Sequence, residues 1–247
     1  MPMQISISNA IGGGGGAQRG GSSFENIQSI ELDGIDAYVD CGNVTTLNGQ
    51  TNITISLWFK QDSSVTGPQY PISKYGTGGS QLLVSYRVGG QIDVLLGGVG
   101  LFRSANNINY SDGNWHNMVI TYDSSRTNIY NRTALRIDDV DIAHSTFRQS
   151  SASIASSTAN LNIGRRTEYN FYEWNGLLDE VAIWNRTLTP TEITEIYNNG
   201  VPTDLSSYSP NNWWRFEGTG TTATDSGSNA NDGTLINAAT RSTDVPT

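Results

Sequence analysis

Short runs of alternating apolar and polar residues, separated by turn residues, constrain the fold of this chain more than any other feature. Residues 53–60 alternate in this way, as expected for a strand with one buried face. Residues 82–88 and 91–96 flank Gly89 and Gly90, which suit a two-residue hairpin loop. Turn residues recur roughly every ten positions, a spacing typical of β-sandwiches. The pattern predicts an all-β fold in which two antiparallel sheets pack face to face.

One short helix is expected near residues 190–198. Thr189 can cap its start, Pro190 suits the first helical position, and Glu192 completes a capping box. Gly200 can end it. The other elements are expected to be strands, over residues 29–40, 53–60, 82–88, 91–96, 115–122, 134–142, 161–164 and 178–184.

Five motifs point to one family. Residues 176–193 match the pattern G-x-[IL]-D-E-[VL]-x-[IL]-[WY]-N-R-x-L-[ST]-x-x-E-[IL] at almost every position. Residues 29–39 contain an opening D-G turn, 53–60 a T-I-S-x-W-x-K strand, 112–116 a D-G-x-W-H segment and 161–164 an L-x-I-G segment. In this order the motifs resemble those of the laminin-G-like, concanavalin-A-like jelly rolls. The resemblance implies a two-sheet antiparallel jelly-roll sandwich over residues 29 to about 200.

One family hairpin is altered in this chain. The family has Y-V-D-G where this sequence has Arg136-Ile137-Asp138-Asp139. Because the glycine that favours a primed turn is missing, we expect a different loop at this hairpin.

The chain is expected to comprise a glycine-rich N-terminal arm and one large domain. The arm covers residues 1–28, and the jelly roll covers residues 29–247. Residues 201–247 resemble a stretch that usually precedes the opening strand of such domains. We expect them to pair back onto the sandwich, because Trp213, Trp214 and Phe216 would otherwise form an exposed apolar patch. The alternative is the stub of a second repeat.

Composition excludes some functions. The net charge is −9 and lysine occurs only at Lys60 and Lys74, so binding to a nucleic-acid backbone is not expected. No apolar run has the length of a membrane span. Cys41 is the single cysteine and is expected to pack as a small hydrophobic residue. The N-terminus does not resemble a classical signal peptide.

Catalysis is not expected. Glucan-cleaving jelly rolls carry E-x-D-x-E on one strand, so that alternation brings three carboxylates to one face. Here Glu31 and Asp33 are present, but Ile35 replaces the third carboxylate. We therefore assign no catalytic residue, with a glycoside hydrolase or lyase as the less favoured alternative.

The resemblance implies one structural calcium ion. In the family, the opening D-G turn and the aspartate of D-E-V lie close together, which corresponds to Asp33 and Asp179, with Asp36 as a weaker addition. The alternative is that these aspartates form turns and accept backbone hydrogen bonds.

A sugar site is expected in the loop of residues 168–174. Tyr169, Asn170, Tyr172 and Trp174 combine rings that can stack on sugars with an amide that can bind hydroxyls. The alternative is ordinary loop packing.

The favoured function is a non-catalytic recognition or adhesion module. The low lysine content, together with the Asn, Thr, Ser and Gly content, suggests a virion or extracellular surface, specifically a phage particle, where the domain binds glycan or decorates the shell. The alternative is a structural virion protein that contacts neighbouring subunits without binding sugar. Other virion or surface proteins are the expected partners, with no nucleic acid and no membrane, and a homo-oligomeric state stays open.

Overall fold

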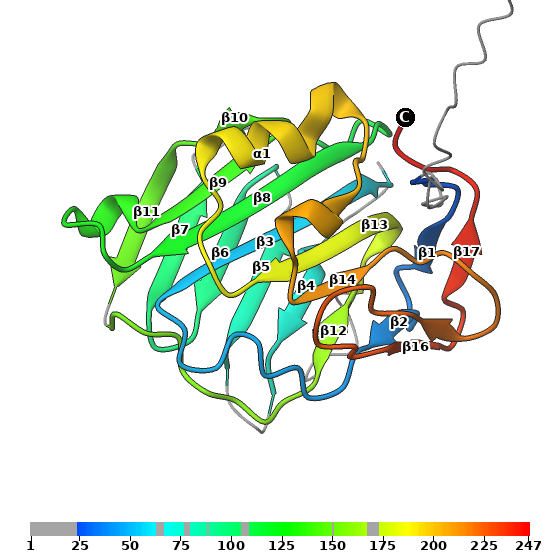
Figure 1. The fold of residues 1–247 in the computed structure, drawn as a ribbon, viewed down its shortest axis with the longest axis horizontal. Helices are drawn as coiled ribbons and strands as arrows, with labels where there is room; N and C mark the ends of the chain where they lie inside the picture. The colour runs from blue at the N-terminus through cyan, green and yellow to red at the C-terminus, as the bar shows by residue number, and fades with distance from the viewer. Residues whose placement is uncertain are drawn as a thin grey trace, which may run out of the picture.

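A computed structural model describes residues 24–62, 67–76, 80–87, 89–104, 109–149, 151–166 and 173–247. Two antiparallel sheets pack face to face, with one short α-helix on the outer side of one of them (Figure 1). The expected all-β, two-sheet sandwich with a single short helix is therefore confirmed.

The first sheet, which we call sheet A, carries the helix on its outer face. Its strand order is β10-β9-β8-β3-β13-β1-β17, and β14 also pairs with β13. These strands are β10 (Val140–Asp141), β9 (Thr133–Ile137), β8 (His116–Asp123), β3 (Asn52–Gln61), β13 (Asn175–Trp184), β1 (Ser29–Asp33), β17 (Thr240–Ser242) and β14 (Asn212–Trp214).

The second sheet, sheet B, has the strand order β11-β7-β6-β5-β4-β12-β2-β16-β15. These strands are β11 (His144–Gln149), β7 (Gly100–Ser104), β6 (Ile92–Leu96), β5 (Leu82–Tyr86), β4 (Gln69–Lys74), β12 (Leu161–Ile163), β2 (Tyr38–Asp40), β16 (Gly233–Ile236) and β15 (Thr222–Ala223).

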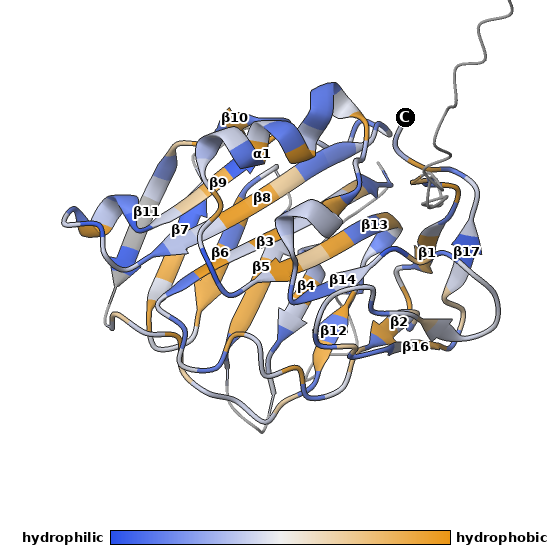
Figure 2. Cartoon of the chain, viewed as in Figure 1, coloured by the Kyte–Doolittle hydropathy of each residue, from blue (hydrophilic) through white to orange (hydrophobic). Residues whose placement is uncertain are grey.

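The main core lies between the sheets and follows strand alternation. Ile53, Ile55, Leu57 and Phe59 of β3 point inward and are fully buried. Sheet A also has a second apolar cluster on its outer face, where the helix and the segment after it cover the strands. Its buried members are Val119, Ala182, Trp184, Leu188, Ile193, Ile196, Leu205 and Trp213. The hydropathy colouring shows apolar and polar residues side by side along β3, β8 and β13 (Figure 2).

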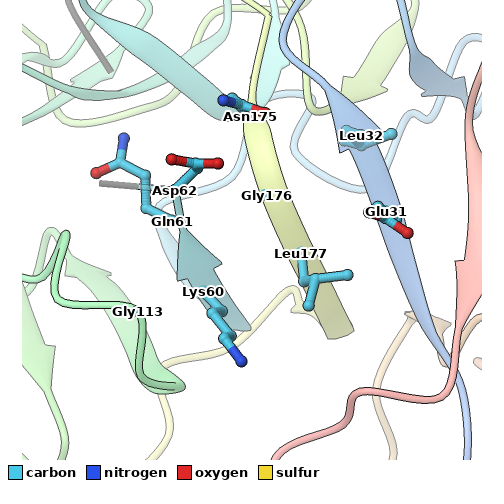
Figure 3. Close-up of a pocket in the computed structure, with 9 residues that line it drawn as sticks. All are labelled: Glu31, Leu32, Lys60, Gln61, Asp62, Gly113, Asn175, Gly176 and Leu177. Atoms are coloured by element: carbon cyan, nitrogen blue, oxygen red, sulfur yellow. The ribbon is translucent and has the colours of Figure 1, made fainter. Parts of the chain in front are cut away.

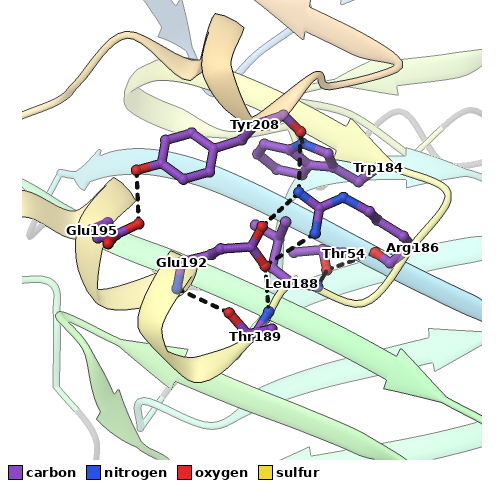
Figure 4. Close-up of polar contacts among 8 residues, drawn as sticks. All are labelled: Thr54, Trp184, Arg186, Leu188, Thr189, Glu192, Glu195 and Tyr208. Atoms are coloured by element: carbon purple, nitrogen blue, oxygen red, sulfur yellow. Dashed lines mark hydrogen bonds and ion pairs between the residues drawn. The ribbon is translucent and has the colours of Figure 1, made fainter.

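Helix α1 (Pro190–Tyr197) begins where the sequence predicts. Thr189 and Glu192 form the expected capping box, and Asn198 ends the helix in a left-handed conformation. The guanidinium of Arg186 donates to both carboxylate oxygens of Glu192 at 2.8 and 3.0 Å (Figure 4). This pair, chiefly, lowers the pKa of Glu192 to about 2. Short 3₁₀ turns occur at η1 (Ile129–Asn131), η2 (Asn198–Gly200) and η3 (Leu205–Tyr208).

The segment after residue 200 adds strands to both sheets. β14 pairs with β13 and β17 pairs with β1 in sheet A, while β16 pairs with β2 in sheet B. Trp214 and Phe216 are buried in the main core. Asp225 organises the segment by accepting hydrogen bonds from the backbone N–H groups of Trp213, Gly227 and Asn231.

Residues 24–28 pack against the sandwich, although we expected the arm to extend to residue 28. The ring of Phe24 stacks on Trp213, and the Asn26 amide donates to Asp179 at 2.9 Å. The backbone N–H of Ile27 donates to Glu217 at 2.8 Å. Residues 1–23 lie outside the described part of the chain.

The hairpin between β9 and β10 keeps a primed turn, although the missing glycine predicted a different loop. Asp138 and Asp139 both adopt the left-handed region, with φ of 52° and 61°. Both carboxylates are tied to other elements: Asp138 accepts from the backbone of Asn117, and Asp139 accepts from Thr194. Aspartate tolerates this conformation better than most residues, and these bonds offset its strain.

No helix among the described residues is long and apolar enough to cross a membrane.

Candidate functional site

The three carboxylates predicted to hold calcium do not meet. β1 and β13 pair so that Asp33 lies opposite Asn175, four residues along β13 from Asp179. At about 3.3 Å per residue, this separates the two aspartates by about 13 Å along the sheet. Asp36 is exposed in the turn after β1. Within the described residues, no cluster of three or more His, Cys, Asp or Glu side chains suits a metal ion.

Asp33 has a structural role instead. Its Oδ1 accepts backbone hydrogen bonds from Ile35, Asp36 and Ala37 at 2.9, 3.2 and 3.1 Å, which closes the turn between β1 and β2. Burial raises the pKa of Asp33, but these backbone donors outweigh it and the net shift is downward. The carboxylate therefore has its partners within its own turn, as the alternative interpretation of the sequence expected.

Asp179 and Glu180 form a buried acidic pair. A bulge in β13, where Glu180 has a φ of 47°, places both consecutive side chains on the outer side of sheet A. Trp213 Nε1 and Arg215 Nε donate to Glu180 at 2.5 and 3.3 Å. Burial raises the pKa of Glu180 to about 7 against the effect of Arg215, and it raises the pKa of Asp179 well above its usual range. The carboxylate of Asp179 accepts from the Asn26 amide, and Arg215 links Glu180 to the Glu25 carbonyl, so the acidic pair anchors residues 24–28 to sheet A.

The predicted sugar-binding loop divides into two parts. Tyr169, Asn170 and Tyr172 lie outside the described residues. Trp174 is fully buried and packs edge-on against Phe59 at 5.9 Å between ring centroids. It is a core residue, so its ring is not available to stack on a sugar.

A pocket of about 350 Å³ lies on the outer face of sheet A, toward the end where β3 finishes and β13 begins. Its walls come from β1, β3, β13 and the loop before β8, and they comprise Glu31, Leu32, Lys60, Gln61, Asp62, Gly113, Asn175, Gly176 and Leu177 (Figure 3). Helix α1 covers a different part of this face, over Val119 and Ala182.

Strand register explains how the outward side chains of the pocket come together. Lys60 lies opposite Leu177, and Leu177 lies opposite Glu31, so three strands contribute one row. Asn175 and Asp62 form the next row, because alternation turns every second residue outward and the backbone N–H of Asp62 donates to the Asn175 carbonyl at 3.0 Å. The pocket therefore combines a cation, carboxylates, an amide and an apolar side chain.

These groups are distributed unevenly. Asp62 and Asn175 lie near each other at one end, the ammonium of Lys60 points toward the other, and Leu177 lies between these ends (Figure 3). Glu31 is exposed, while Lys60 and Asn175 are half-buried. A polar ligand with an apolar face could thus contact Leu177 and donate hydrogen bonds to the carboxylates.

The loop at the edge of the pocket is held by His116. Its Nδ1 lies 2.7 Å from Asp138 and its Nε2 lies 3.1 Å from Asp112. Burial lowers the pKa of His116, but the two aspartates outweigh this and raise it overall. This arrangement fixes Gly113 and Trp115 beside the pocket.

Trp115 extends the row beyond Lys60. The two side chains share one acceptor: the Lys60 ammonium and the Trp115 indole N–H donate to opposite oxygens of Asp244, at 2.6 and 2.8 Å. Burial raises the pKa of Asp244, but these two donors lower it overall. Asp244 follows β17, so the C-terminal segment borders the pocket.

The sequence patterns did not predict this pocket, although signals for it are present in the chain. The alternation of residues 53–60, extended by two positions, places Lys60 and Asp62 on the same face. Only the register of β3 against β13 shows that Asn175 and Leu177 join them, and single-strand alternation carries no such information.

The chain belongs to the concanavalin A-like lectin/glucanases superfamily. The model of the laminin G group of this superfamily matches residues 33–194, more than half of the chain. None of the curated proteins compared with the chain matches it in sequence.

Several solved structures share the fold. One is a candidate carbohydrate-binding protein from Bacteroides ovatus, with a TM-score of 0.65 and 12% identity over 90% of this chain and 62% of that one. Another is the heptameric SAP-like pentraxin of Limulus polyphemus, with a TM-score of 0.50 and 14% identity over 69% and 82% of the two chains. The extracellular region of zebrafish Gpr126/Adgrg6 gives a TM-score of 0.54 and 11% identity over 89% and 26%. At these identities the likeness shows the fold alone, and this chain spans only 62% of the first structure's length.

Proposed function

We propose that this chain is a non-catalytic carbohydrate-recognition module that binds its ligand in the pocket of sheet A. The observation that carries the proposal is the juxtaposition of Leu177 with Lys60, Asp62 and Asn175 on one open sheet face. Sugars present apolar C–H faces edged by hydroxyl groups, and such a surface offers a partner for each. Membership of a superfamily of lectins and glucanases supports the same class of ligand.

The size of the pocket is consistent with this ligand. Small-molecule sites occupy roughly 300–1,000 Å³, so a cavity of about 350 Å³ suits one or two sugar rings. Asp62 and Glu31 can accept hydrogen bonds from hydroxyl groups, and Asn175 can both donate and accept. The half-buried ring of Trp115 adds an aromatic edge next to Lys60.

A binding role is favoured over hydrolysis. Glycoside hydrolysis needs two carboxylates placed across the scissile bond. On β1, Asp33 already accepts three backbone hydrogen bonds in its own turn, and Ile35 replaces the third carboxylate of the glucanase pattern. Glu31 is therefore the one carboxylate of β1 that lines the pocket, and the other acidic residue in the described part of the lining, Asp62, directly follows β3 rather than belonging to the glucanase pattern.

A glycan array with matched variants tests the proposal. We expect wild type to bind a defined set of glycans, and the double variant Asp62→Ala/Asn175→Ala to lose at least ten-fold in affinity. Asp141→Ala serves as the control, because it removes an exposed carboxylate from β10 at the far edge of the same sheet. Absence of binding by wild type, or equal binding by the double variant, would refute the proposal.

For its setting, we propose a particle or cell surface, with a phage virion as the specific case. What supports it is the composition, with only two lysines and a net charge of −9. Mass spectrometry of purified particles from the source tests the setting. Detection of the chain at stoichiometric abundance would support it, and absence from both particles and cell surface would refute it.

A further inference from the structure

We propose that Lys60 and Trp115 form a carboxylate-binding subsite at the edge of this pocket, which makes the module selective for saccharides that carry a carboxylate, such as uronic acids. In the free protein, Asp244 of the chain's own C-terminal segment fills this subsite. The inference rests on the proposed function, because it names the class of sugar that the same pocket would take.

The geometry of Asp244 carries the inference. Its carboxylate receives one hydrogen bond on each oxygen: Lys60 Nζ donates to Oδ2 at 2.6 Å, and Trp115 Nε1 donates to Oδ1 at 2.8 Å. Two donors, one from β3 and one from the residue directly before β8, thus converge on one carboxylate, with a charge-assisted bond on one side. A carboxylate of any origin that reaches this position would meet the same donors.

The subsite is continuous with the pocket. Lys60 lines the pocket and lies opposite Leu177 in the sheet, while Gly113 of the pocket wall lies two residues before Trp115. A sugar ring over Leu177 would therefore direct a carboxylate on that ring toward Lys60. Its hydroxyl groups would face Asp62 and Asn175 at the opposite end.

Charge explains why Lys60 would decide selectivity. Among the residues that the structure describes, Lys60 is the one cationic side chain that lines the pocket, and Lys74, the other lysine, is buried in β4. Glu31 and Asp62 also line the pocket and disfavour a ligand of high negative charge. The site therefore suits one carboxylate per binding unit among many hydroxyl groups, as in a uronic acid, better than a densely sulfated chain.

Asp244 can leave without unfolding the segment. Its side chain is 45% exposed, and its backbone is held separately, because Ser29 Oγ donates to its carbonyl at 2.6 Å and its N–H donates to Ser242 Oγ. A change of the Asp244 rotamer frees Lys60 and Trp115. The apparent affinity for an acidic sugar is then reduced by the fraction of molecules in which Asp244 occupies the subsite.

Calorimetric titration with matched ligands tests the inference. The probes are tetrasaccharides of galacturonate, glucuronate and mannuronate, each beside its carboxyl-reduced counterpart, which keeps the backbone and loses the charge. Asp244→Ala should bind the acidic member of at least one pair about five-fold more tightly than wild type, and the reduced member unchanged. Lys60→Met should lose at least ten-fold for the acidic member, and Lys60→Arg should lose less. Asp141→Ala, which removes an equally short surface ion pair at Arg136, should match wild type.

The outcomes separate the two proposals. If no acidic member binds, or if Asp244→Ala and Lys60→Met change acidic and reduced ligands alike, the carboxylate subsite is refuted. In that case the proposed function still stands if the array has found neutral glycans whose binding depends on Asp62 and Asn175. Preference for the acidic member that falls with Lys60→Met and rises with Asp244→Ala supports the subsite.

Discussion

Trp174 illustrates how burial decides the role of a single residue. Its indole is fully buried, and the indole N–H has no hydrogen-bond partner among the described residues. We expect Trp174→Ala to lower the free energy of unfolding by about 3–5 kcal/mol through the cavity it leaves. Trp174→Phe should cost less than half of that, because no hydrogen bond is lost. Urea unfolding measures both, and equal costs would contradict this role.

The buried acidic pair predicts a pH dependence. The pKa of Glu180 is raised to about 7, so the folded state binds a proton that the unfolded state releases near pH 4.5. Stability from this group is present below about pH 4.5 and is lost as the pH rises to about 7. The pKa of Asp179 is raised as well, chiefly by burial. Glu217 raises the pKa values of both carboxyl groups, whereas Arg215 lowers that of Glu180.

Glu180→Gln should therefore remove part of this dependence. Between pH 5 and pH 8, wild type should lose on the order of 2 kcal/mol more than the variant. The pKa of His116 is also raised, so its contribution to the stability of the protein falls as the pH rises through this range. The measured quantity is therefore the difference between wild type and variant in the free energy of urea unfolding. Parallel curves for the two proteins would show that Glu180 does not titrate in this window.

Removal of metal ions tests the calcium prediction. Asp33 closes its own turn, and Asp179 is held by Asn26 and Glu180, so these carboxylates do not fit a shared ion. We expect EDTA to leave the melting temperature within about 1 °C of the untreated protein, and added Ca²⁺ to have no effect. A fall with EDTA that Ca²⁺ reverses would reinstate the ion that the family resemblance implies.

At the scale of elements, the segment before β1 belongs to the folded unit. Deleting residues 1–21 should leave the melting temperature nearly unchanged, as expected for a glycine-rich arm. Deleting residues 1–28 should lower it by several degrees, because the Phe24 ring, the Asn26 amide and the backbone of Ile27 would no longer cover Trp213 and the buried acidic pair. Thermal melts of the two truncations beside wild type measure this, and equal melting temperatures would contradict it.

Elements specified by local contacts were predictable from the sequence. Helix α1 begins at its predicted capping box, because Thr189 and Glu192 contact only neighbours in the chain. The turn at Asp138 and Asp139 was not predicted, because its stabilising partners include Asn117 and Thr194, which are distant in sequence. Local propensity reflects the first kind of contact and not the second.

At the scale of the whole molecule, motif order predicted the sandwich and strand register determined the site. Alternation fixes which side chains of one strand face outward, but it does not say which neighbour a strand meets. The pairing of β3 with β13 and β1 therefore had to be observed before Lys60, Leu177 and Glu31 could be recognised as one surface. The same pairing separates Asp33 from Asp179, which motif resemblance had placed together.

The most direct test of the central claim is an NMR titration of the ¹⁵N-labelled protein with the best ligand from the glycan array. We predict that the amide shifts that change most lie at residues 31–33, 60–62, 113–115 and 175–177, around the pocket of sheet A. Changes concentrated on the outer face of sheet B or around α1, with these positions unmoved, would contradict binding at this pocket.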